Sequence, residues 1–341
     1  MPKYSIIIPI YNRKEEVLEL IESLGDSSYK KIELLLIDGS PDNVLKDIDQ
    51  TVINGSFQFH YQRIHKPYLG ISDSRNLGAK IAKGEFLIFF DSDVIIPPEY
   101  FDVLDETLGS INYDMFGGPD CAHESFNPVQ KAISYCMTSV LTTGGIRGKK
   151  VRVGKFKPRG FNMGVKKKIF DEVDGFNSNL KVGEDIDLSI RVINRGYKSG
   201  LIPELFVYHK RRVNLKKFYN QVFRFGAARI LLGKNHKGEN RIAFYFPLFF
   251  LIALLAGPFL LFNVRLFQLW SFGLTAYLLM NLIIGTIQNK SLRVGLLIVP
   301  TLLVQFTAYA FGFIKNWYFV YVLKKSEGIF TIKKEGPDSP E

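Results

Sequence analysis

Two aspartates separated by one residue, Asp91 and Asp93, offer the clearest chemistry in the sequence. They directly follow an apolar run that has the composition of a buried strand. In an extended segment, side chains at positions i and i+2 point the same way, so both carboxylates can face one ligand. Mg²⁺ or Mn²⁺ binds such carboxylates and fills its remaining positions with phosphate oxygens and water. Bound there, the metal would neutralise a leaving diphosphate. Taken alone, the pair is also compatible with two solvated acids ahead of Pro97 and Pro98.

The aspartate pair follows a series of alternating strands and helices. Apolar runs predict strands over Tyr4–Ile8, Ile32–Ile37, Phe57–Tyr61 and Phe86–Phe90. One helix is expected near Ser72–Ala82, and another begins after Asn12, with Glu15 in the capping-box position. This β-α-β-α order predicts an α/β fold with a Rossmann-like, mainly parallel sheet flanked by helices.

Further acidic residues stand where such a fold binds ligands. Asp38 ends the second predicted strand, and parallel sheets bind ligands at the carboxyl ends of their strands. Asp38 and the aspartate pair are therefore expected to share one crevice. Glu184 and Asp185 open a predicted helix over Ile186–Asn194, where acids also occur simply because they favour helix N-termini.

A set of short motifs occurs in an order that resembles family 2 glycosyltransferases. The motifs are Ser5–Asn12, Asp38-Gly39-Ser40, Ser74-Arg75-Asn76 with Gly78, Gly84-Glu85-Phe86, Asp91-Ser92-Asp93, Gly160–Gly164, Asp174-Gly175-Phe176, and Gly183–Leu188 with Arg191. The resemblance covers about residues 1–230. It implies a GT-A fold, a nucleotide-diphosphate-sugar donor and inversion at the anomeric carbon.

The resemblance also implies roles for individual residues. Asp185, with Glu184 beside it, resembles the catalytic base that takes a proton from the acceptor hydroxyl. Asp38 resembles the aspartate that accepts an N–H from the nucleotide base, a task that suits an acceptor-only carboxylate. Arg75 is expected either at the donor phosphates or in a structural ion pair. The remaining residues expected to border the nucleotide are Pro9, Tyr11, Asn12 and Ser92.

Acceptor or diphosphate contacts are expected from five residues: Asn162, His209, Arg212, Gln221 and Arg224. Gln221 and Arg224 are similar to the Gln-x-x-Arg-Trp motif of processive membrane synthases. Phe225 stands in place of the tryptophan, which argues against processive synthesis. Residues 215–232 have the pattern of an amphipathic basic helix that lies at a membrane surface.

The C-terminal third of the sequence is apolar enough for a membrane. Three uncharged stretches, 243–262, 266–287 and 294–314, each have the length of about 20 residues that spans a bilayer as a helix. They divide the chain into a GT-A catalytic domain (1–205), a basic interfacial region (206–241), a transmembrane region (243–323) and a tail (324–341).

The charge distribution supports a membrane partner and argues against nucleic acid. The net charge is +11, and the ten lysines and arginines of residues 206–241 end where the apolar stretches begin. Because lysines and arginines favour the cytoplasmic side, the catalytic domain is expected in the cytoplasm and the protein in the cell membrane as a multi-pass protein. No nucleic-acid motif accompanies the charge, so no nucleic-acid partner is expected. Cys121 and Cys136 have no metal-ligand spacing.

The favoured interpretation is a metal-dependent, inverting, membrane-bound glycosyltransferase. It would move a sugar, with UDP-sugars favoured as donors, to a hydroxyl of a lipid-linked or polysaccharide acceptor in cell-envelope or exopolysaccharide biosynthesis. One alternative is a polyprenyl-phosphate sugar synthase, whose phosphate acceptor has little need of a base. The non-enzymatic alternative is an inactive GT-A module that serves as a membrane scaffold.

Overall fold

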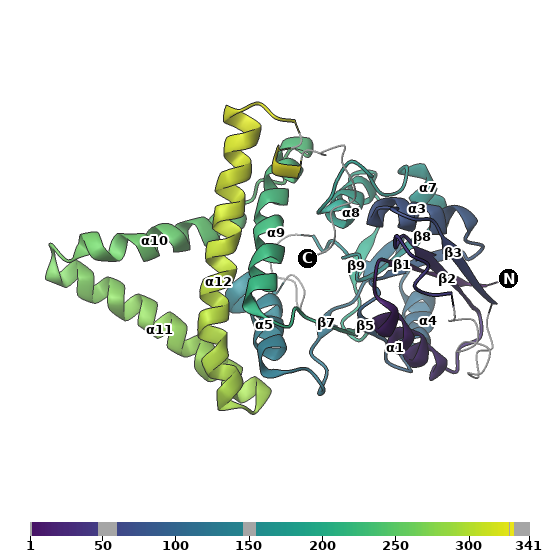
Figure 1. Cartoon of the computed structure of the whole chain (residues 1–341), viewed down its shortest axis with the longest axis horizontal. Helices are drawn as coiled ribbons and strands as arrows, with labels where there is room; N and C mark the ends of the chain where they lie inside the picture. Colours follow the sequence, from purple (N-terminus) through teal and green to yellow (C-terminus); the bar gives the residue numbers. More distant parts are fainter. Residues whose placement is uncertain (1, 47–59, 146–154, 327, 331–341) are drawn as a thin grey trace. The chain divides into compact units, whose positions relative to one another are not determined.

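The computed structural model describes residues 2–46, 60–145, 155–326 and 328–330. The chain forms two compact units (Figure 1). The first contains Met1–His123 and Ile146–Lys210, and the second contains Glu124–Gly145 and Arg211–Glu341. Parts of two expected features, the strand at 57–61 and the tail, lie outside the described residues, as does part of the lysine- and arginine-rich segment 147–168.

A seven-stranded sheet in the order β3-β2-β1-β4-β8-β6-β9 forms the centre of the first unit. Its strands are β1 (Tyr4–Ile10), β2 (Ile32–Asp38), β3 (His60–His65), β4 (Phe86–Phe90), β6 (Met115–Gly117), β8 (Asn162–Lys166) and β9 (Ser199–Leu201). The first four are mutually parallel, and β8 runs antiparallel to both β4 and β6. The predicted mainly parallel sheet is confirmed, and β2 and β4 end at the same edge.

Helices cover both faces of this sheet because its central strands are apolar on both sides. Within the residues that the structure describes, the helices of this unit are α1 (Lys14–Gly25), α3 (Ile71–Ile81), α4 (Tyr100–Ser110), α7 (Lys167–Glu172) and α8 (Glu184–Asn194). In β1, Ile6 and Ile8 belong to the core that α1 and α4 cover, whereas Ile7 belongs to the core beneath α3 and α8. Burying one such side chain contributes about 1.5–3 kcal/mol, and the paired cores fix the strand ends that carry the polar site.

The predicted capping box at the start of α1 is absent, so that prediction was wrong. The helix begins at Lys14, and the residue before it makes no capping hydrogen bond through its side chain. Asn12 adopts a left-handed conformation (φ 51°), and its backbone N–H donates to Oγ of Ser40 at 2.8 Å. Asn12 therefore joins the ends of β1 and β2 instead of capping the helix.

A second, three-stranded sheet extends the first unit beyond the boundary expected at residue 205. It consists of β5 (Val94–Ile95), β10 (Val207–His209) and β7 (Asp120–Cys121), with β10 in the middle. His209 pairs with Val94 in register, and the backbone N–H of Lys210 donates to the carbonyl oxygen of Asp93 at 2.9 Å. This pairing places His209 beside the aspartate pair.

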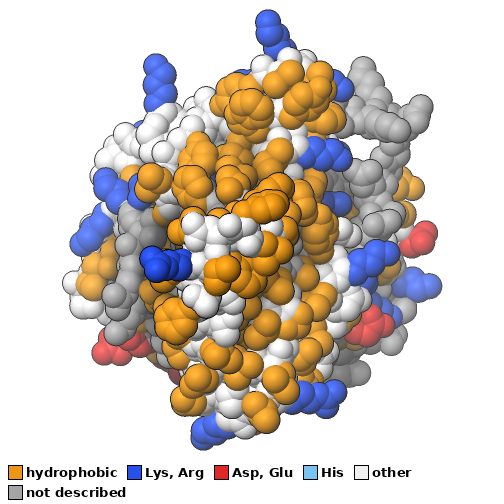
Figure 2. All heavy atoms as spheres, turned by 90° about the vertical axis from the view of Figure 1, so that its left-hand side faces the viewer, with side chains coloured by type: hydrophobic (Ala, Val, Ile, Leu, Met, Phe, Trp, Pro, Cys, Tyr) orange, Lys and Arg blue, Asp and Glu red, His pale blue; other side chains and the backbone are white. Residues whose placement is uncertain are grey.

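The second unit is entirely helical in the part that the structure describes. It contains α5 (Pro128–Thr138), α6 (Val140–Thr143), α9 (Leu215–Asn235), α10 (Phe246–Leu260), α11 (Val264–Asn289) and α12 (Leu292–Trp317), with short helical turns at Ile242–Tyr245, Tyr318–Val322 and Gly328–Phe330. The segments Ile242–Leu260, Val264–Asn289 and Leu292–Val322 are long and apolar enough to cross a membrane. Figure 2 shows that apolar side chains cover much of the outer face of this region.

The basic helix α9 packs along α12 (Figure 1). Two glycines make this close approach possible: a Cβ on Gly226 would lie 2.1 Å from the carbonyl oxygen of Tyr309, and a Cβ on Gly312 would lie 1.9 Å from that of Phe223. The apolar stripe expected at a membrane surface over residues 215–232 is thus largely occupied by another helix of the same unit.

Candidate active site

The aspartate pair and His209 form a cluster with the donor set of a metal site. One ligand atom from each of Asp91, Asp93 and His209 lies within 4.8 Å of the others. Nε2 of His209 is 3.2 Å from Oδ1 of Asp93 and 4.0 Å from Oδ2 of Asp91. Two carboxylates and an imidazole at these separations fit one divalent cation.

Two arginines orient the carboxylates of this cluster. Arg13 Nη1 donates to Oδ2 of Asp93 at 2.6 Å, and Arg75 Nη2 donates to Oδ1 of Asp91 at 2.7 Å. In each aspartate, one oxygen accepts from an arginine and the other lies on the side of His209. The arginines therefore leave one oxygen of each carboxylate facing the position that a cation would take.

His209 is positioned by its own neighbours. Its ring stacks on Phe161 with centroids 5.0 Å apart and planes inclined by 22°. Its other nitrogen, Nδ1, lies 3.6 Å from the buried carboxylate of Asp120. A carboxylate on that side favours a proton on Nδ1 and a lone pair on Nε2, which is the arrangement of metal-binding histidines. The sequence indicated His209 only as an acceptor or diphosphate contact, because its metal-facing position depends on the pairing of β10 with β5.

Arg75 is a fully enclosed cation at the centre of the site. Its side chain is 2% exposed, and it binds Glu184 Oε1 through Nη1 at 2.8 Å as well as Asp91. Gly160 leaves room for it, since a Cβ there would lie 2.4 Å from Nη2. Two roles were expected for Arg75, and the observed contacts are those of a structural ion pair. The contact with donor phosphates stays a prediction.

Glu184 and Asp185 occupy different environments at the start of α8. Glu184 is buried, and that burial, reinforced by the charge of Asp185, raises its pKa to about 7 against the opposing effect of Arg75. Asp185 is partly exposed; its Oδ2 accepts from the N–H of Gly160 at 3.1 Å, and its Oδ1 accepts from that of Ile186 at 2.7 Å. Asp185 is thus the more accessible of the two.

A second polar group lies where β1 and β2 end. Asp38 is fully buried, and its Oδ1 accepts from the backbone N–H of Ser40 at 3.0 Å. Its Oδ2 has no hydrogen-bond partner among the residues that the structure describes. A buried acceptor without a donor is costly, so this oxygen is available for an N–H group of a ligand. The predicted neighbours Tyr11 and Asn12 leave β1 at the same edge, after the buried Pro9.

The remaining predicted site residues lie in several places. Ser92 is buried between the two aspartates. Asn162 is fully buried, accepts from Tyr100 at 2.6 Å and donates to the carbonyl oxygen of Leu205 at 2.7 Å, so its side chain supports the site from within. The other three candidates belong to the second unit: Arg212, Gln221 and Arg224. Their predicted acceptor contacts stay predictions.

Comparison with known proteins bears on the family and fold of this chain. Residues 5–171 match the model of the family described as glycosyl transferase family 2. A mannosyltransferase from Pyrobaculum calidifontis, solved with GDP-Man and Mn²⁺, superimposes with a TM-score of 0.57 at 14% identity, covering 93% of this chain and 87% of that one. At this identity the likeness shows the GT-A-type fold alone.

Two curated relatives extend the comparison. An uncharacterized glycosyltransferase of Haemophilus influenzae is 27% identical over 197 residues, which are 55% of this chain and 61% of that protein. A dolichyl N-acetyl-alpha-D-glucosaminyl phosphate 3-beta-D-2,3-diacetamido-2,3-dideoxy-beta-D-glucuronosyltransferase of Methanococcus voltae is 25% identical over 263 residues, covering 74% of this chain and 80% of that protein. The chain spans less than two thirds of the length of several curated relatives that it matches. The motifs, the fold and these relatives together establish that the chain belongs to glycosyl transferase family 2 and carries three helices long enough to cross a membrane.

Proposed function

We propose that the protein is a metal-dependent, inverting transferase that moves a sugar from a nucleotide diphosphate to a hydroxyl of a lipid-linked or polysaccharide acceptor, in cell-envelope or exopolysaccharide biosynthesis. The observation that carries the proposal is the placement of Asp91, Asp93 and His209 within 4.8 Å of one another at the end of β4. Arg75 links this cluster to the start of α8, where Asp185 lies.

The three clustered residues would hold Mg²⁺ or Mn²⁺. A cation bound there supplies positive charge that stabilises the leaving nucleotide diphosphate. The Pyrobaculum mannosyltransferase was solved with Mn²⁺, but the proposal for this chain depends on its own donor set. Arg13 and Arg75 hold the two aspartates in the orientation that this task needs.

Asp185 acts on the acceptor. It takes the proton of the acceptor hydroxyl, the hydroxyl oxygen forms a bond to the anomeric carbon, and the bond from that carbon to the diphosphate oxygen breaks with its electron pair leaving on the diphosphate. The acceptor attacks opposite the leaving group, so the anomeric configuration inverts. Glu184 instead holds Arg75, because its carboxylate is buried against that guanidinium.

Asp38 is proposed to read the nucleotide base. Its buried Oδ2 has no donor among the described residues, and the N–H group of a uracil or guanine ring would supply one. UDP-sugars are the favoured donors in this proposal. The Pyrobaculum protein holds GDP-Man, so a test must include both bases.

The proposed acceptor is held at the membrane. Three helices of the second unit are long enough to span it, and the name of the Methanococcus relative describes a dolichyl-phosphate-linked acceptor. The proposed location is the cell membrane, with three spans and the catalytic unit on the cytoplasmic side, as the basic residues before the first span favour. The backbone N–H groups of Gly160 and Ile186 hold the carboxylate of Asp185 in place, and a positioned base is needed by a hydroxyl acceptor but not by a phosphate acceptor.

The test is a panel of UDP- and GDP-sugars offered to the purified full-length protein in detergent, with released nucleotide as the readout. Release should require Mg²⁺ or Mn²⁺ and should fall to background in Asp93→Asn. Release that is unaffected by excess EDTA would contradict the metal proposal. Failure to release nucleotide from any donor would favour the inactive scaffold.

A further inference from the structure

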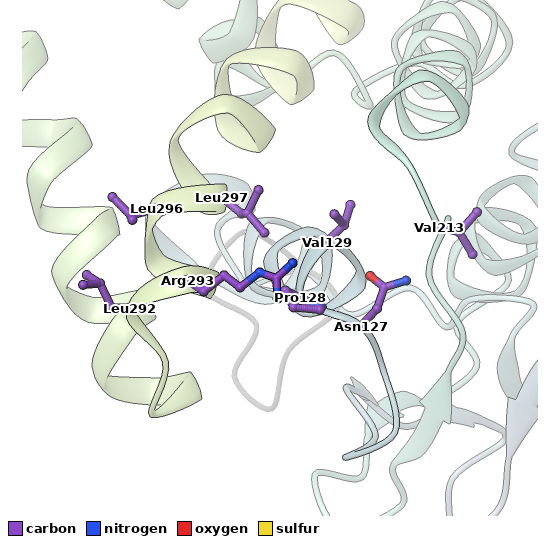
Figure 3. A pocket seen from close by; sticks show the side chains of 8 residues that line it. All are labelled: Asn127, Pro128, Val129, Val213, Leu292, Arg293, Leu296 and Leu297. Carbon is purple, nitrogen blue, oxygen red and sulfur yellow. The ribbon is translucent and has the colours of Figure 1, made fainter.

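A groove of about 640 Å³ lies in the second unit, where the first turns of α5 and α12 approach the segment before α9 (Figure 3). Six of its eight lining residues are apolar; the lining consists of Asn127, Pro128, Val129, Val213, Leu292, Arg293, Leu296 and Leu297. This volume lies in the range of about 300–1,000 Å³ that is usual for small-molecule sites. Gln130 Nε2 donates to the carbonyl oxygen of Arg211 at 2.9 Å, which fixes one wall of the groove beside Val213.

One end of this groove favours an anion. Arg293 is the charged member of the lining, and Figure 3 shows its side chain extending toward Pro128. Two helices also begin here. Asn127 caps α5 by accepting from the N–H of Gln130 at 2.9 Å, and Ser291 caps α12. Helix N-termini carry partial positive charge, so both dipoles add to the charge of Arg293.

The groove also lies where a membrane surface is expected. Lys290 and Ser291 form the turn between two apolar helices, and basic residues favour the headgroup level at such turns. From there, the exposed side chains of Leu292 and Leu296 follow α12 toward the apolar part of the span. In the described part of this unit, 16 lysines and arginines stand against only Glu124 and Glu239. The surroundings therefore attract negatively charged molecules.

We propose that this groove binds the hydrocarbon chain of a phosphorylated lipid, with the lipid phosphate at Arg293 between the starts of α5 and α12. A neutral lipid would use the apolar wall but not the charge, and a free phosphate would use the charge but not the wall. A second copy of this basic unit lacks the complementary charge. The inference rests on the proposed function in one respect, which is that this lipid carries the acceptor sugar.

The test uses the full-length protein in phosphatidylcholine nanodiscs with a diazirine-bearing farnesyl phosphate as photolabel, and cross-links are mapped by mass spectrometry. Farnesyl phosphate, farnesol and inorganic phosphate serve as competitors. Arg293→Gln removes the charge, and Leu296→Trp fills the groove. Arg265→Gln is the control for Arg293→Gln, because Arg265 is also the second residue of a capped membrane helix. Leu255→Trp is the control for Leu296→Trp, because the exposed fractions of the two leucines are similar, 59% and 56%.

Labelling should map to the groove, and farnesyl phosphate should compete at least tenfold better than farnesol or inorganic phosphate. Arg293→Gln and Leu296→Trp should each weaken lipid binding about tenfold or more. The first removes a charge-assisted contact with the lipid phosphate, and the second removes the space for the hydrocarbon chain. Arg265→Gln and Leu255→Trp should bind as the wild type does. The proposal is overturned if farnesol or inorganic phosphate competes as well as farnesyl phosphate does. It is also overturned if the label maps to a contact between two copies of the protein. No nucleotide sugar is present, so the result is independent of transfer activity.

Discussion

Asp91 and Glu184 bind the same guanidinium: Arg75 donates to Asp91 at 2.7 Å and to Glu184 at 2.8 Å. The first carboxylate belongs to the proposed metal site, and the second directly precedes the proposed base. A single buried cation thus sets the separation between the end of β4 and the start of α8. A planar guanidinium can bind both carboxylates at once, which a lysine ammonium does less well.

Replacing Arg75 by lysine should therefore be strongly destabilising. The variant leaves either the buried Glu184 or the half-buried Asp91 without its partner, and breaking a buried pair costs about 3–5 kcal/mol. Thermal unfolding in detergent should show a clear loss of melting temperature, and metal affinity should fall because Asp91 loses its orientation. Arg63→Lys is the control, since Arg63 makes an exposed contact with Asn43. An unchanged melting temperature would show that the two carboxylates do not depend on Arg75.

Asp93→Asn should lower turnover roughly a hundredfold or more, because a metal at a leaving group supplies several kcal/mol of stabilisation. The protein should still fold, since asparagine keeps the shape of the side chain. Direct titration with Mn²⁺ should show weaker binding in Asp93→Asn and in His209→Ala. Asp102→Asn on the exposed face of α4 is the matched control. Normal Mn²⁺ affinity in His209→Ala would remove His209 from the metal site.

The stability of the protein should depend on pH through Glu184. Its folded-state pKa of about 7 exceeds the ordinary value of 4.5, so the carboxyl of Glu184 binds its proton more tightly in the native state than in the unfolded state. The resulting stabilisation, at most about 3 kcal/mol, is complete below pH 4.5 and is lost as the pH rises through 7.

The comparison that isolates this effect is wild type against Glu184→Gln. Between pH 5 and pH 8 the melting temperature of the wild type should fall more steeply than that of the variant. Glu106→Gln, at an exposed position on α4, should keep the wild-type slope. Parallel profiles for wild type and Glu184→Gln would mean that the carboxyl of Glu184 titrates in its ordinary range.

Asp185→Asn should separate donor binding from transfer. The change is nearly isosteric, so donor affinity should survive, whereas general-base assistance is typically worth about 10²–10⁴-fold in rate. The loss should appear in kcat more than in KM for the donor. Single-turnover transfer and donor affinity, measured on wild type and variant, decide the matter. If transfer falls less than about tenfold, the polyprenyl-phosphate sugar synthase becomes the better assignment, because a phosphate acceptor needs no base.

The close packing of α9 on α12 predicts that alanine destabilises the protein much more at Gly312 than at Gly273. Gly312→Ala places a Cβ 1.9 Å from a backbone oxygen, so the two helices must separate, and overpacking of this kind costs about 1–3 kcal/mol. Gly273→Ala on α11 meets no atom within 4 Å and should be neutral or slightly stabilising. Melting temperatures of both variants in the same detergent provide the measurement. Equal effects at the two positions would contradict the close helix approach.

The sequence predicted the elements whose signals are local. Apolar runs located β1, β2 and β4 and the three long helices, and the spacing of Asp91 and Asp93 placed both carboxylates at the end of a strand. Side-chain periodicity and strand order suffice for this much, since parallel strands bring their carboxyl ends to one edge.

The features that the sequence did not reveal depend on long-range pairing. Arg13 lies three residues after the end of β1 and outside every motif identified in the sequence, yet it binds Asp93 across the site. His209 faces the aspartates only because β10 pairs with β5, and Asp120 approaches it from the neighbouring β7. The predicted capping box is absent for the same reason, since the backbone N–H of Asn12 donates to the hydroxyl of Ser40, just after β2.

The placement of α5 has a consequence for how such a protein is divided or recombined. The segment Glu124–Gly145 lies within the family-matched sequence, yet it belongs to the helical unit. The polypeptide consequently passes from one unit to the other three times. A gene fragment that ends before the first span would retain α5 but lose α12, and the side chains of Ile133 and Cys136 would lose the α12 residues that help to bury them. The helical unit therefore cannot be removed by truncating the gene at one point. Exchanging it between relatives requires replacing two separate stretches of the gene together.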